Sequence, residues 1–406
     1  MKVLFLSCAV PSVVMQEVNE TDEYPPVAAD KQQWNIINGI ERASGRPVDL
    51  LSFVPCSNYP RFPRILMGST RWHHESGSDD LIVPFINLPV VKHVTQFLSF
   101  FIAIVRWLWK NKSSSPRRVL VYMLHSPYVF AALLASRLFG EKPILIVADL
   151  PMGASKPKNP FKRFFKPALT HLLLKSLRRY AGLVVLTRQM AEDYAPGVPF
   201  IVMEGIVSLE EMGNLGYLRR ASGNGNVPKI VTFAGLLREE YGTKLLLDAF
   251  ALIPDDSYRL WIFGRGNDDM VTAVKDSEAR DPRIKYWGFR PNKEVLLKEM
   301  ESTVLVNPRP SRKFTAYSFP SKLMEYMSIG RPVISAALPG IPSEYHEYLY
   351  VWQDETPEGL AELMVSVCSK SQAELQAMGQ RAREFVMTEK DYLTQGRRIY
   401  AFLQQV

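Results

Sequence analysis

Residues 315–335 constrain the fold more than any other stretch, because they combine a loop, a helix, a tight turn and a buried strand. The stretch is TAYSFPSKLMEYMSIGRPVIS. Pro320 suits the first turn of a helix, and Ser321 can cap an orphan backbone N–H there. Gly330 ends the helix, and Arg331-Pro332 leads into an apolar run that is typical of a buried strand.

Two charged side chains lie near the start of this helix. Lys322 and Glu325 are three residues apart, so they project from the same face. A cation and a carboxylate at a helix N-terminus beside a strand are typical of the place where a doubly wound sheet holds a phosphorylated ligand. The alternative is a surface salt pair on an ordinary helix. The flanking loop–helix–Gly–Pro–strand pattern favours the ligand site.

The alternation of strands and helices occurs twice, on either side of a linker at residues 222–228 (SGNGNVP). The first half begins with a strand at 2–7, a polar loop at 11–30, a helix at 31–43 and a strand at 48–54. After the linker, strands are expected at 229–234, 258–263, 284–287 and 302–307. We therefore predict two α/β domains with doubly wound parallel sheets, divided into residues 1–222 and 223–385.

A strongly apolar segment occupies residues 94–109. It is shorter than the roughly 20 residues that a membrane span needs, and it carries Arg106. We predict a core helix. The apolar run at the N-terminus is only as long as one buried strand, so we interpret it as the first strand and not as a signal peptide. Three scattered cysteines lack metal-ligand or redox spacing, which favours reduced thiols in the cytosol.

Charge is distributed unevenly along the chain. Residues 81–191 contain 17 Lys and Arg but only Glu141 and Asp149, a balance of +15; since the whole chain carries +8, the remainder carries −7. Nucleic acid, anionic lipid or a phosphorylated substrate would each suit the basic part. Within it, basic and aromatic residues alternate at helical spacing, which favours a helix on an anionic membrane. The predicted membrane-facing residues are Lys162, Arg163, Phe164, Phe165 and Lys166.

Two alternatives to the membrane remain open for this segment. A core helix with a solvated cationic face would show the same pattern. Nucleic acid would also suit the charge, but no recognised nucleic-acid-binding module accompanies it.

Polar residues follow several predicted strands directly. His125 and Asp149 stand at the carboxyl ends of two strands in the first half, where parallel sheets bind ligands. The alternative for each is a loop residue that satisfies backbone groups. In the second half, Gly235 and Gly264 follow strands and allow a close backbone approach, and Arg238 is a candidate phosphate cation. The first strand is not followed by Gly-x-Gly-x-x-Gly, which disfavours nicotinamide or flavin binding.

An ordered series of motifs carries a family resemblance. It comprises FAGLL (233–237), YGTKLLLDAF (241–250), IFGRG (262–266), IKYWGF (284–289) and FPSKLMEYMSIGRPVI (319–334). Residues 229–335 thereby resemble the donor domain of family 4 retaining glycosyltransferases, which have the two-domain GT-B fold. The first half is similar more loosely, through ADLP (148–151) and VVLT (184–187).

The resemblance implies transfer of a sugar from a nucleotide diphospho-sugar with retention at the anomeric carbon. It implies no cofactor and no essential metal, and the chain also lacks an Asp-x-Asp motif. Two Rossmann-like domains would face a central cleft, and residues 386–406 would return as a helix to the first domain. Glu325 would accept hydrogen bonds from the ribose, whereas Lys322 and Arg238 would neutralise the leaving diphosphate.

The remaining implied site residues complete this assignment. The donor site would comprise Gly235, Arg238, Gly264, Arg265, Ser321, Lys322 and Glu325. His125 and Asp149 would contact the acceptor, and Asp149 would join Glu325, Lys322 and Arg238 as a catalytic residue.

Four positions depart from the family pattern. Tyr317 replaces a glutamate, Leu236 an arginine and Tyr241 a lysine; Ala148 replaces the strand-end histidine. Arg238 would then substitute for one of the missing cations. The departures keep open a catalytically silent protein of the same fold that acts as a binding or scaffold subunit.

The resulting prediction is a cytoplasmic glycosyltransferase that is peripheral on the inner face of the cell membrane. Its partners would be a nucleotide sugar, a saccharide or lipid-linked saccharide acceptor and the anionic membrane surface, but not nucleic acid. Assignment to surface polysaccharide or glycolipid synthesis rests on analogy. An enzyme of the same class with a soluble acceptor is the nearest alternative.

Overall fold

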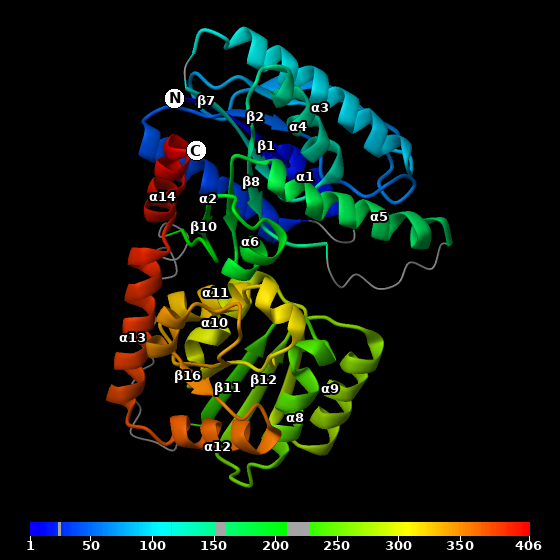
Figure 1. Cartoon of the computed structure of the whole chain (residues 1–406). Coiled ribbons are helices and arrows are strands. Elements are labelled where there is room, and N and C mark those ends of the chain that lie inside the picture. Colours follow the sequence, from blue (N-terminus) through cyan, green and yellow to red (C-terminus); the bar gives the residue numbers. More distant parts are fainter. Residues whose placement is uncertain (23–25, 115, 152–159, 209–227) are drawn as a thin grey trace. The chain divides into compact units, whose positions relative to one another are not determined.

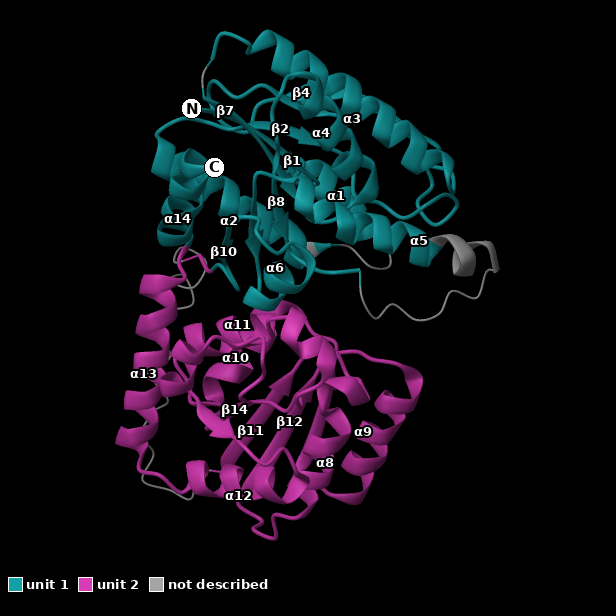
Figure 2. Ribbon diagram, viewed as in Figure 1, with its two compact units in different colours: residues 1–206, 392–406 teal, residues 207–391 magenta. Residues whose placement is uncertain are grey.

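The computed structural model describes residues 1–22, 26–114, 116–151, 160–208 and 228–406 (Figure 1). The chain forms two compact units (Figure 2). Unit 1 comprises Met1–Ile206 and Tyr392–Val406, and unit 2 comprises Val207–Asp391. The predicted boundary at 222/223 lies outside the described residues. The second division falls at 391/392 and not at 385/386, because α13 (Gln372–Glu389) continues as one helix past residue 385.

Unit 1 contains an eight-stranded sheet in the order β10-β9-β8-β7-β1-β2-β5-β4. All neighbours are parallel except β4 and β5. The strands are β1 (Lys2–Ser7), β2 (Asp49–Ser52), β4 (Thr70–Trp72), β5 (Asp80–Ile82), β7 (Arg117–Tyr122), β8 (Ile144–Val147), β9 (Gly182–Val185) and β10 (Phe200–Val202). A separate antiparallel pair is formed by β3 (Leu66–Met67) and β6 (Phe85–Ile86). Parallel strands need cover on both faces, which explains their nearly continuous apolar sequences.

The helices of unit 1 connect these strands. They are α1 (Ser12–Thr21), α2 (Val27–Ser44), α3 (Val91–Lys110), α4 (Ser126–Leu138), α5 (Pro160–Ser176), a 3-10 turn at Leu177–Arg179, α6 (Arg188–Tyr194) and α14 (Tyr392–Gln405). The C-terminal helix α14 packs closely on α2. Gly39 and Gly396 permit this approach, since a Cβ on Gly396 would lie 2.2 Å from the carbonyl carbon of Gly39.

Unit 2 contains a six-stranded, fully parallel sheet in the order β13-β12-β11-β14-β15-β16. The strands are β11 (Lys229–Ala234), β12 (Tyr258–Phe263), β13 (Ile284–Gly288), β14 (Val304–Asn307), β15 (Val333–Ala336) and β16 (Tyr350–Trp352). The α-helices are α8 (Thr243–Ala251), α9 (Asp268–Arg280), α10 (Asn292–Glu301), α11 (Ser321–Ile329), α12 (Pro357–Cys368) and α13, with 3-10 turns at Glu239–Tyr241, Lys313–Tyr317 and Ser343–Tyr348.

Each sheet reverses its strand order at one point. The reversal lies between β1 and β7 in unit 1 and between β11 and β14 in unit 2. Loops that leave the carboxyl ends of the strands on either side of such a point diverge and leave room for a ligand. The predicted doubly wound α/β architecture is therefore confirmed for both units.

The predicted polar loop at residues 11–30 is wrong. Helix α1 and the beginning of α2 occupy most of it. Met15 and Val18 are buried from α1, and this three-residue spacing is the helical signal that the many acidic residues concealed. Asp22, at the end of α1, accepts a hydrogen bond from the Ser57 hydroxyl at 2.7 Å.

The predicted core helix at residues 94–109 is correct for one face only. Phe100, Ile104 and Leu108 are fully buried on the inner face of α3. Its opposite face is exposed and apolar. Within the described part of the chain, α3 is the one helix that is long and apolar enough to cross a membrane by length and composition.

Candidate functional site

The strand reversal of unit 2 is surrounded by loops that hydrogen-bond to one another. The N–H of Gly235, directly after β11, donates to the carbonyl of Phe263 at 3.0 Å. Two residues later, Leu237 donates to the carbonyl of Arg265 at 2.8 Å. The next strand continues the pattern, since Gly264 donates to the carbonyl of Gly288 at 2.9 Å. The glycines predicted for the donor site thus form one connected rim at the carboxyl ends of β11, β12 and β13.

Helix α11 is fixed to this rim by a buried tyrosine. The hydroxyl of Tyr326 accepts a hydrogen bond from the N–H of Ala234 at 2.8 Å and donates one to the carbonyl of the same residue at 3.1 Å. Ala234 immediately precedes Gly235. Because residues four apart lie on the same helical face, Lys322 lies one turn from this anchor on the side of the rim.

Lys322 and Glu325 form a direct ion pair, as their spacing predicts. A third charged side chain, Glu299 of α10, has its Oε1 atom 3.8 Å from Lys322 Nζ. Burial by itself lowers the pKa of Lys322, but the neighbouring carboxyl groups, Glu325 first and Glu299 second, outweigh that effect and raise it. Lys322 is therefore a firmly protonated cation, held by carboxylates at the start of α11.

Glu299 is a functional candidate that the sequence reasoning missed. Its side chain is fully buried, and neither carboxyl oxygen has a hydrogen-bond partner within the described part of the chain. Burial raises its pKa well above the usual range, and the charge of Glu325 raises it further while Lys322 opposes both. A single Glu within a helical pattern gives no sequence signal of this kind, because only the packing of α10 against α11 places it below the ion pair.

The turn between β11 and α8 carries the predicted phosphate cation. Arg238 is exposed and pairs with Glu240 at 3.3 Å, and its N–H donates to the Thr243 hydroxyl at 3.2 Å. Gly242 has a positive φ of 81°, and a Cβ there would lie 1.8 Å from the carbonyl oxygen of Pro308 in the loop after β14. The two loops that flank the strand reversal therefore touch at Gly242.

Arg309, the residue after Pro308, is a second cation that the sequence reasoning missed. It is buried, with its guanidinium over the rings of Tyr241 (4.9 Å) and Phe314 (4.8 Å), and one nitrogen donates to the Ser318 hydroxyl at 3.0 Å. Burial lowers its pKa, although an arginine stays charged. The aromatic Tyr241 at this turn thus holds a cation from the neighbouring loop.

Two predicted donor residues take positions that differ in detail from the expectation. Ser321 is the first residue of α11, whereas Pro320 occupies the capping position, and no side chain caps this helix. The predicted capping role of Ser321 is wrong, because a residue inside the first turn cannot reach the N–H groups that follow a cap. Arg265 is exposed, and its guanidinium lies 5.0 Å from the centre of the Phe289 ring.

In unit 1, His125 stands at the capping position of α4, just beyond β7. Its ring stacks on Phe53 at 4.9 Å, and its Nε2 atom lies 3.1 Å from Gln96 Oε1. Burial, together with the nearby charges of His93 and Lys92, lowers the pKa of His125 to about 3. The imidazole is therefore neutral, and Met123 before it has an unusual φ of 59°, which marks a strained turn at the strand reversal.

Asp149 follows β8, which pairs with β7, so it stands at the same sheet edge as His125. Its side chain reaches solvent. Partial desolvation raises the pKa of its carboxyl, and the N–H of Leu150 opposes that shift. The two predicted acceptor residues therefore share one edge of the sheet, next to the strand reversal of unit 1.

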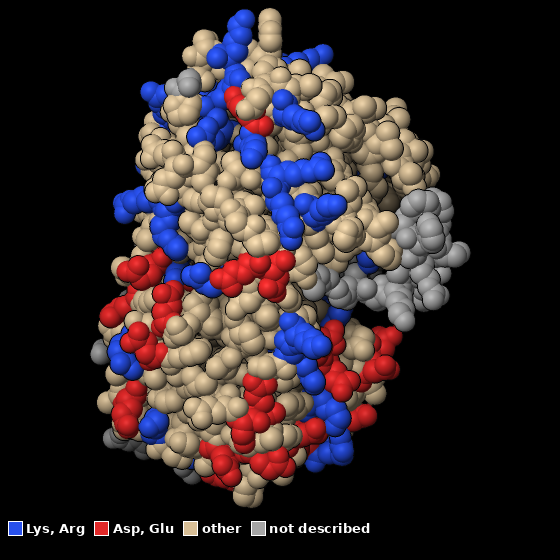
Figure 3. Space-filling model, in the orientation of Figure 1, with Lys and Arg blue, Asp and Glu red and all other residues tan. Residues whose placement is uncertain are grey.

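The predicted membrane-facing residues begin α5. The side chains of Lys162, Arg163, Phe164 and Phe165 lie outside the described part of the structure, whereas Lys166 is half-buried. On the face shown in Figure 3, Lys and Arg dominate unit 1, and Asp and Glu gather on unit 2. The charge asymmetry in the sequence thus follows the division into units.

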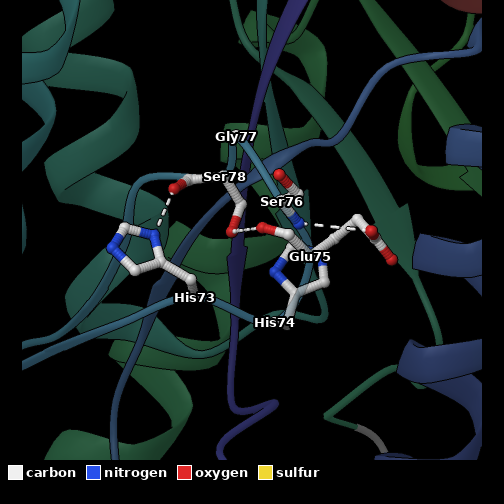
Figure 4. Close-up of a pocket in the computed structure, with 6 residues that line it drawn as sticks. All are labelled: His73, His74, Glu75, Ser76, Gly77 and Ser78. Carbon is white, nitrogen blue, oxygen red and sulfur yellow. Dashed lines mark hydrogen bonds between the residues drawn. The ribbon is translucent and has the colours of Figure 1, made fainter.

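A pocket in unit 1 lies away from these residues. It is lined by His73, His74, Glu75, Ser76, Gly77 and Ser78 in the turn between β4 and β5 (Figure 4). This turn precedes β5 and therefore lies at the amino edge of the parallel strands. His74 is held there by Asp80 (2.7 Å) and Glu41 (2.9 Å). Burial lowers its pKa, but the two carboxylates raise it to about 9, which indicates a structural ion cluster.

Across the described ranges, no three His, Cys, Asp or Glu side chains are grouped so that they could hold a metal ion. Metal independence stays a prediction.

Comparison with known proteins finds a family match for part of the chain. Residues 228–370 match the family described as "Glycosyl transferases group 1". The amylovoran biosynthesis glycosyltransferase AmsK of Erwinia amylovora is 26% identical over 161 residues, which cover 38% of this chain and 39% of that protein. The chain thus matches less than half of the length of this curated relative.

Solved structures resemble the chain along its whole length. HepE of Anabaena in complex with UDP has a TM-score of 0.60 at 14% identity and covers 100% of both chains. Sucrose-phosphate synthase of Thermosynechococcus elongatus has a TM-score of 0.65 at 12% identity. The match covers 100% of this chain and 99% of the synthase chain. At such low sequence identity, the structural likeness shows the fold alone. Membership of family 4 in particular stays a prediction. The chain therefore has the GT-B fold, and its residues 228–370 match the group 1 glycosyltransferase family.

Proposed function

We propose that this protein is a retaining glycosyltransferase that moves a sugar from a nucleotide diphospho-sugar to a lipid-linked saccharide during surface polysaccharide or glycolipid synthesis. One observation carries the proposal. The Lys322–Glu325 pair starts α11, and Tyr326 of that helix is hydrogen-bonded to the residue before the Gly235 rim. A cation, a carboxylate and the carboxyl ends of the strands therefore meet at the strand reversal of the domain that matches the group 1 family.

In this proposal the donor diphosphate takes the place of one carboxylate at Lys322. Lys322 stays protonated throughout, because burial lowers its pKa less than Glu299 and Glu325 raise it. Its charge stabilises the diphosphate as the sugar–oxygen bond breaks, which is the transition-state charge that the reaction develops. Glu325, released from the pair, accepts the ribose hydroxyls. Arg238 from the turn before α8 supplies a second cation.

The acceptor side is proposed for unit 1. Asp149 and His125 stand at one sheet edge beside the strand reversal. The raised pKa of Asp149 suits a carboxyl that contacts a sugar hydroxyl, whereas the neutral His125 imidazole offers one donor and one acceptor. AmsK is an amylovoran biosynthesis glycosyltransferase, which supports a polysaccharide product for the matched region.

We further propose that the protein acts in the cytoplasm as a peripheral protein on the inner face of the membrane, without nucleic acid as a partner. The support is the +15 balance of residues 81–191 and the basic surface of unit 1 in Figure 3. A soluble saccharide acceptor is the alternative within the same enzyme class. Activity on a water-soluble saccharide, and none on a lipid-linked one, would favour it.

The first test is thermal unfolding with a panel of nucleoside diphosphates and nucleotide sugars, with and without a chelator. A ligand that binds only the folded protein raises its melting temperature. We expect a shift with one base, unaffected by the chelator. UDP leads the panel because HepE was solved with it. The absence of a shift with every nucleotide would favour the catalytically silent scaffold, to which Tyr317, Leu236 and Tyr241 point.

The second test separates the site from an ordinary salt pair. Lys322→Ala and Glu325→Ala are each expected to abolish transfer and to leave the protein folded. Lys298 and Glu301 of α10 are a matched control, since they form a surface ion pair with the same spacing at 2.9 Å. Their alanine variants should retain full activity. A folded Lys322→Ala enzyme that is as active as Lys298→Ala would show that the donor site lies elsewhere. The anomeric configuration of the product, read by NMR, tests retention.

A further inference from the structure

The outward face of α3 is apolar along the whole helix. Val91, Val94, Leu98, Ile102 and Trp109 form one row, hereafter the α3 stripe. The last four of these side chains are 55%, 49%, 46% and 66% exposed. Their spacing of three, four and seven residues places them on one side of the helix. Scattered exposed leucines are common on proteins, but a contiguous row of this length marks a surface that is covered in the working protein.

The inner face of α3 is firmly part of unit 1. Phe100, Ile104 and Leu108 are buried there. The indole N–H of Trp107 donates to Asp49 at 2.6 Å, and the ammonium of Lys92 donates to the carbonyl of Cys56 at 2.6 Å. If α3 left the unit to cross a bilayer, these polar groups would lose their partners. Whatever covers the stripe therefore approaches from outside, with α3 lying on the surface.

The charges beside the stripe select the class of partner. Residues 81–140 contain seven Lys or Arg and no Asp or Glu. Arg106 and Lys112 are exposed next to the stripe, and the Lys112 ammonium lies 5.5 Å from the centre of the Trp109 ring. Lys110 is bound to Asp79 of the β4–β5 turn at 2.7 Å. The surface over α3 in Figure 3 is nearly free of charged side chains.

We infer that the α3 stripe is the surface by which unit 1 lies on an anionic lipid bilayer, with the apolar side chains in the acyl boundary and Arg106 and Lys112 at the headgroups. An exposed tryptophan beside a lysine at the end of an apolar helical face is the pattern that interfacial helices show. A second copy of the chain fits less well, because it would bring the same cations against one another.

This inference deepens the proposed membrane attachment, on which it rests, and it is independent of sugar transfer. It also places the attachment on α3, where the sequence predicted a core helix. Leu134 and Leu138 of the adjacent α4 are exposed as well and extend the apolar surface. The basic start of α5 is a separate candidate surface, which the experiment below distinguishes from α3.

The test is flotation of the full chain with vesicles of phosphatidylcholine alone, or mixed with about 30% phosphatidylglycerol so that the surface carries anionic lipid. The wild type should bind the mixed vesicles and bind the neutral ones at least roughly fivefold less, because each basic residue near the surface adds a factor of this size. Leu98→Gln with Ile102→Gln should lower the partition coefficient at least about tenfold, since binding scales with the apolar area inserted.

The matched control changes two exposed apolar residues of unit 2, Leu252→Gln with Val365→Gln, and should bind as the wild type does. Quenching of tryptophan fluorescence by brominated lipid gives a second readout, which Trp109→Phe should reduce. Equal binding by the Leu98/Ile102 variant and the control would overturn the α3 assignment and leave membrane attachment standing. No vesicle binding by the wild type would overturn both the α3 assignment and membrane attachment. A dimer that the Leu98/Ile102 variant dissociates would overturn the α3 assignment. Unchanged nucleotide affinity in that variant separates these outcomes from the donor site.

Discussion

Tyr326→Phe is the perturbation that best tests how α11 is positioned. The variant keeps the ring, so no cavity forms, but it removes a hydroxyl that both accepts from and donates to the backbone of Ala234, at 2.8 Å and 3.1 Å. Tyr326 is completely buried, so water cannot replace the lost partner. Two net hydrogen bonds and one orphaned backbone N–H together cost about 3 kcal/mol.

A loss of that size should lower the melting temperature of unit 2 by roughly 6–12 °C, since 1 kcal/mol corresponds to a few degrees in a domain of this size. Tyr286→Phe is the control, because its hydroxyl makes a single bond to the carbonyl of Gly264 at 3.0 Å in a half-buried setting. It should cost about 1 kcal/mol. Differential scanning calorimetry gives both values.

Tyr326→Phe should also weaken nucleotide binding, because α11 carries Lys322 and Glu325. The nucleotide to use is the nucleoside diphosphate that raises the melting temperature most. We expect a dissociation constant about tenfold higher by titration calorimetry, the change that 1.4 kcal/mol produces. The reasoning is refuted if Tyr326→Phe is no less stable than Tyr286→Phe and binds the nucleotide as the wild type does.

Three further predictions concern other parts of the two units. Gly242→Ala should destabilise unit 2 by about 2–4 kcal/mol through a contact with the next loop, whereas Gly288→Ala, also at positive φ but in open space, should cost only about 1 kcal/mol by urea unfolding. Because the folded pKa of Glu299 is raised, its contribution to stability is lost as pH rises above about 4.5, so Glu299→Gln should gain stability relative to the wild type as pH rises above that value; a stability difference that does not change with pH would contradict the buried neutral acid. The folded pKa of His74 is also raised, but here the protonated form is the charged one: its stabilisation is complete below pH 6.5 and should fall by about 3 kcal/mol as pH rises to about 9, so the melting temperatures of wild type and His74→Phe should converge over that range.

Local patterns predicted much of unit 2. The alternation of apolar runs and helical periods gave every strand from β11 to β15 close to its observed position, because strands that are buried on both faces must be apolar throughout. Gly330 ends α11 in a left-handed conformation as expected. The Lys322–Glu325 pair also followed from spacing alone, since it lies within one turn of a single helix.

The same reasoning failed where the decisive contacts are distant in sequence. Helix α1 was predicted as a loop, because its few buried residues are surrounded by acidic ones. The β4–β5 hairpin is short, and a buried cluster of His74, Asp80 and Glu41 holds it, which no local propensity reveals. Sequence periodicity also could not tell whether an all-round apolar helix such as α3 is covered on both faces, because burial depends on its neighbours.

By itself, the sequence determined the α/β class, the second doubly wound unit and the identity of the two charged residues at the start of α11. Each depends on interactions within a few residues or within one strand–helix repeat. Only the tertiary structure decided that Tyr326 fixes α11 to the end of β11, and that Glu299 and Arg309 are buried beside the site. It also decided that α3 leaves an apolar face exposed. These features join elements far apart in the chain, and their energies come from burial and from hydrogen bonds that exist only once the sheets are assembled.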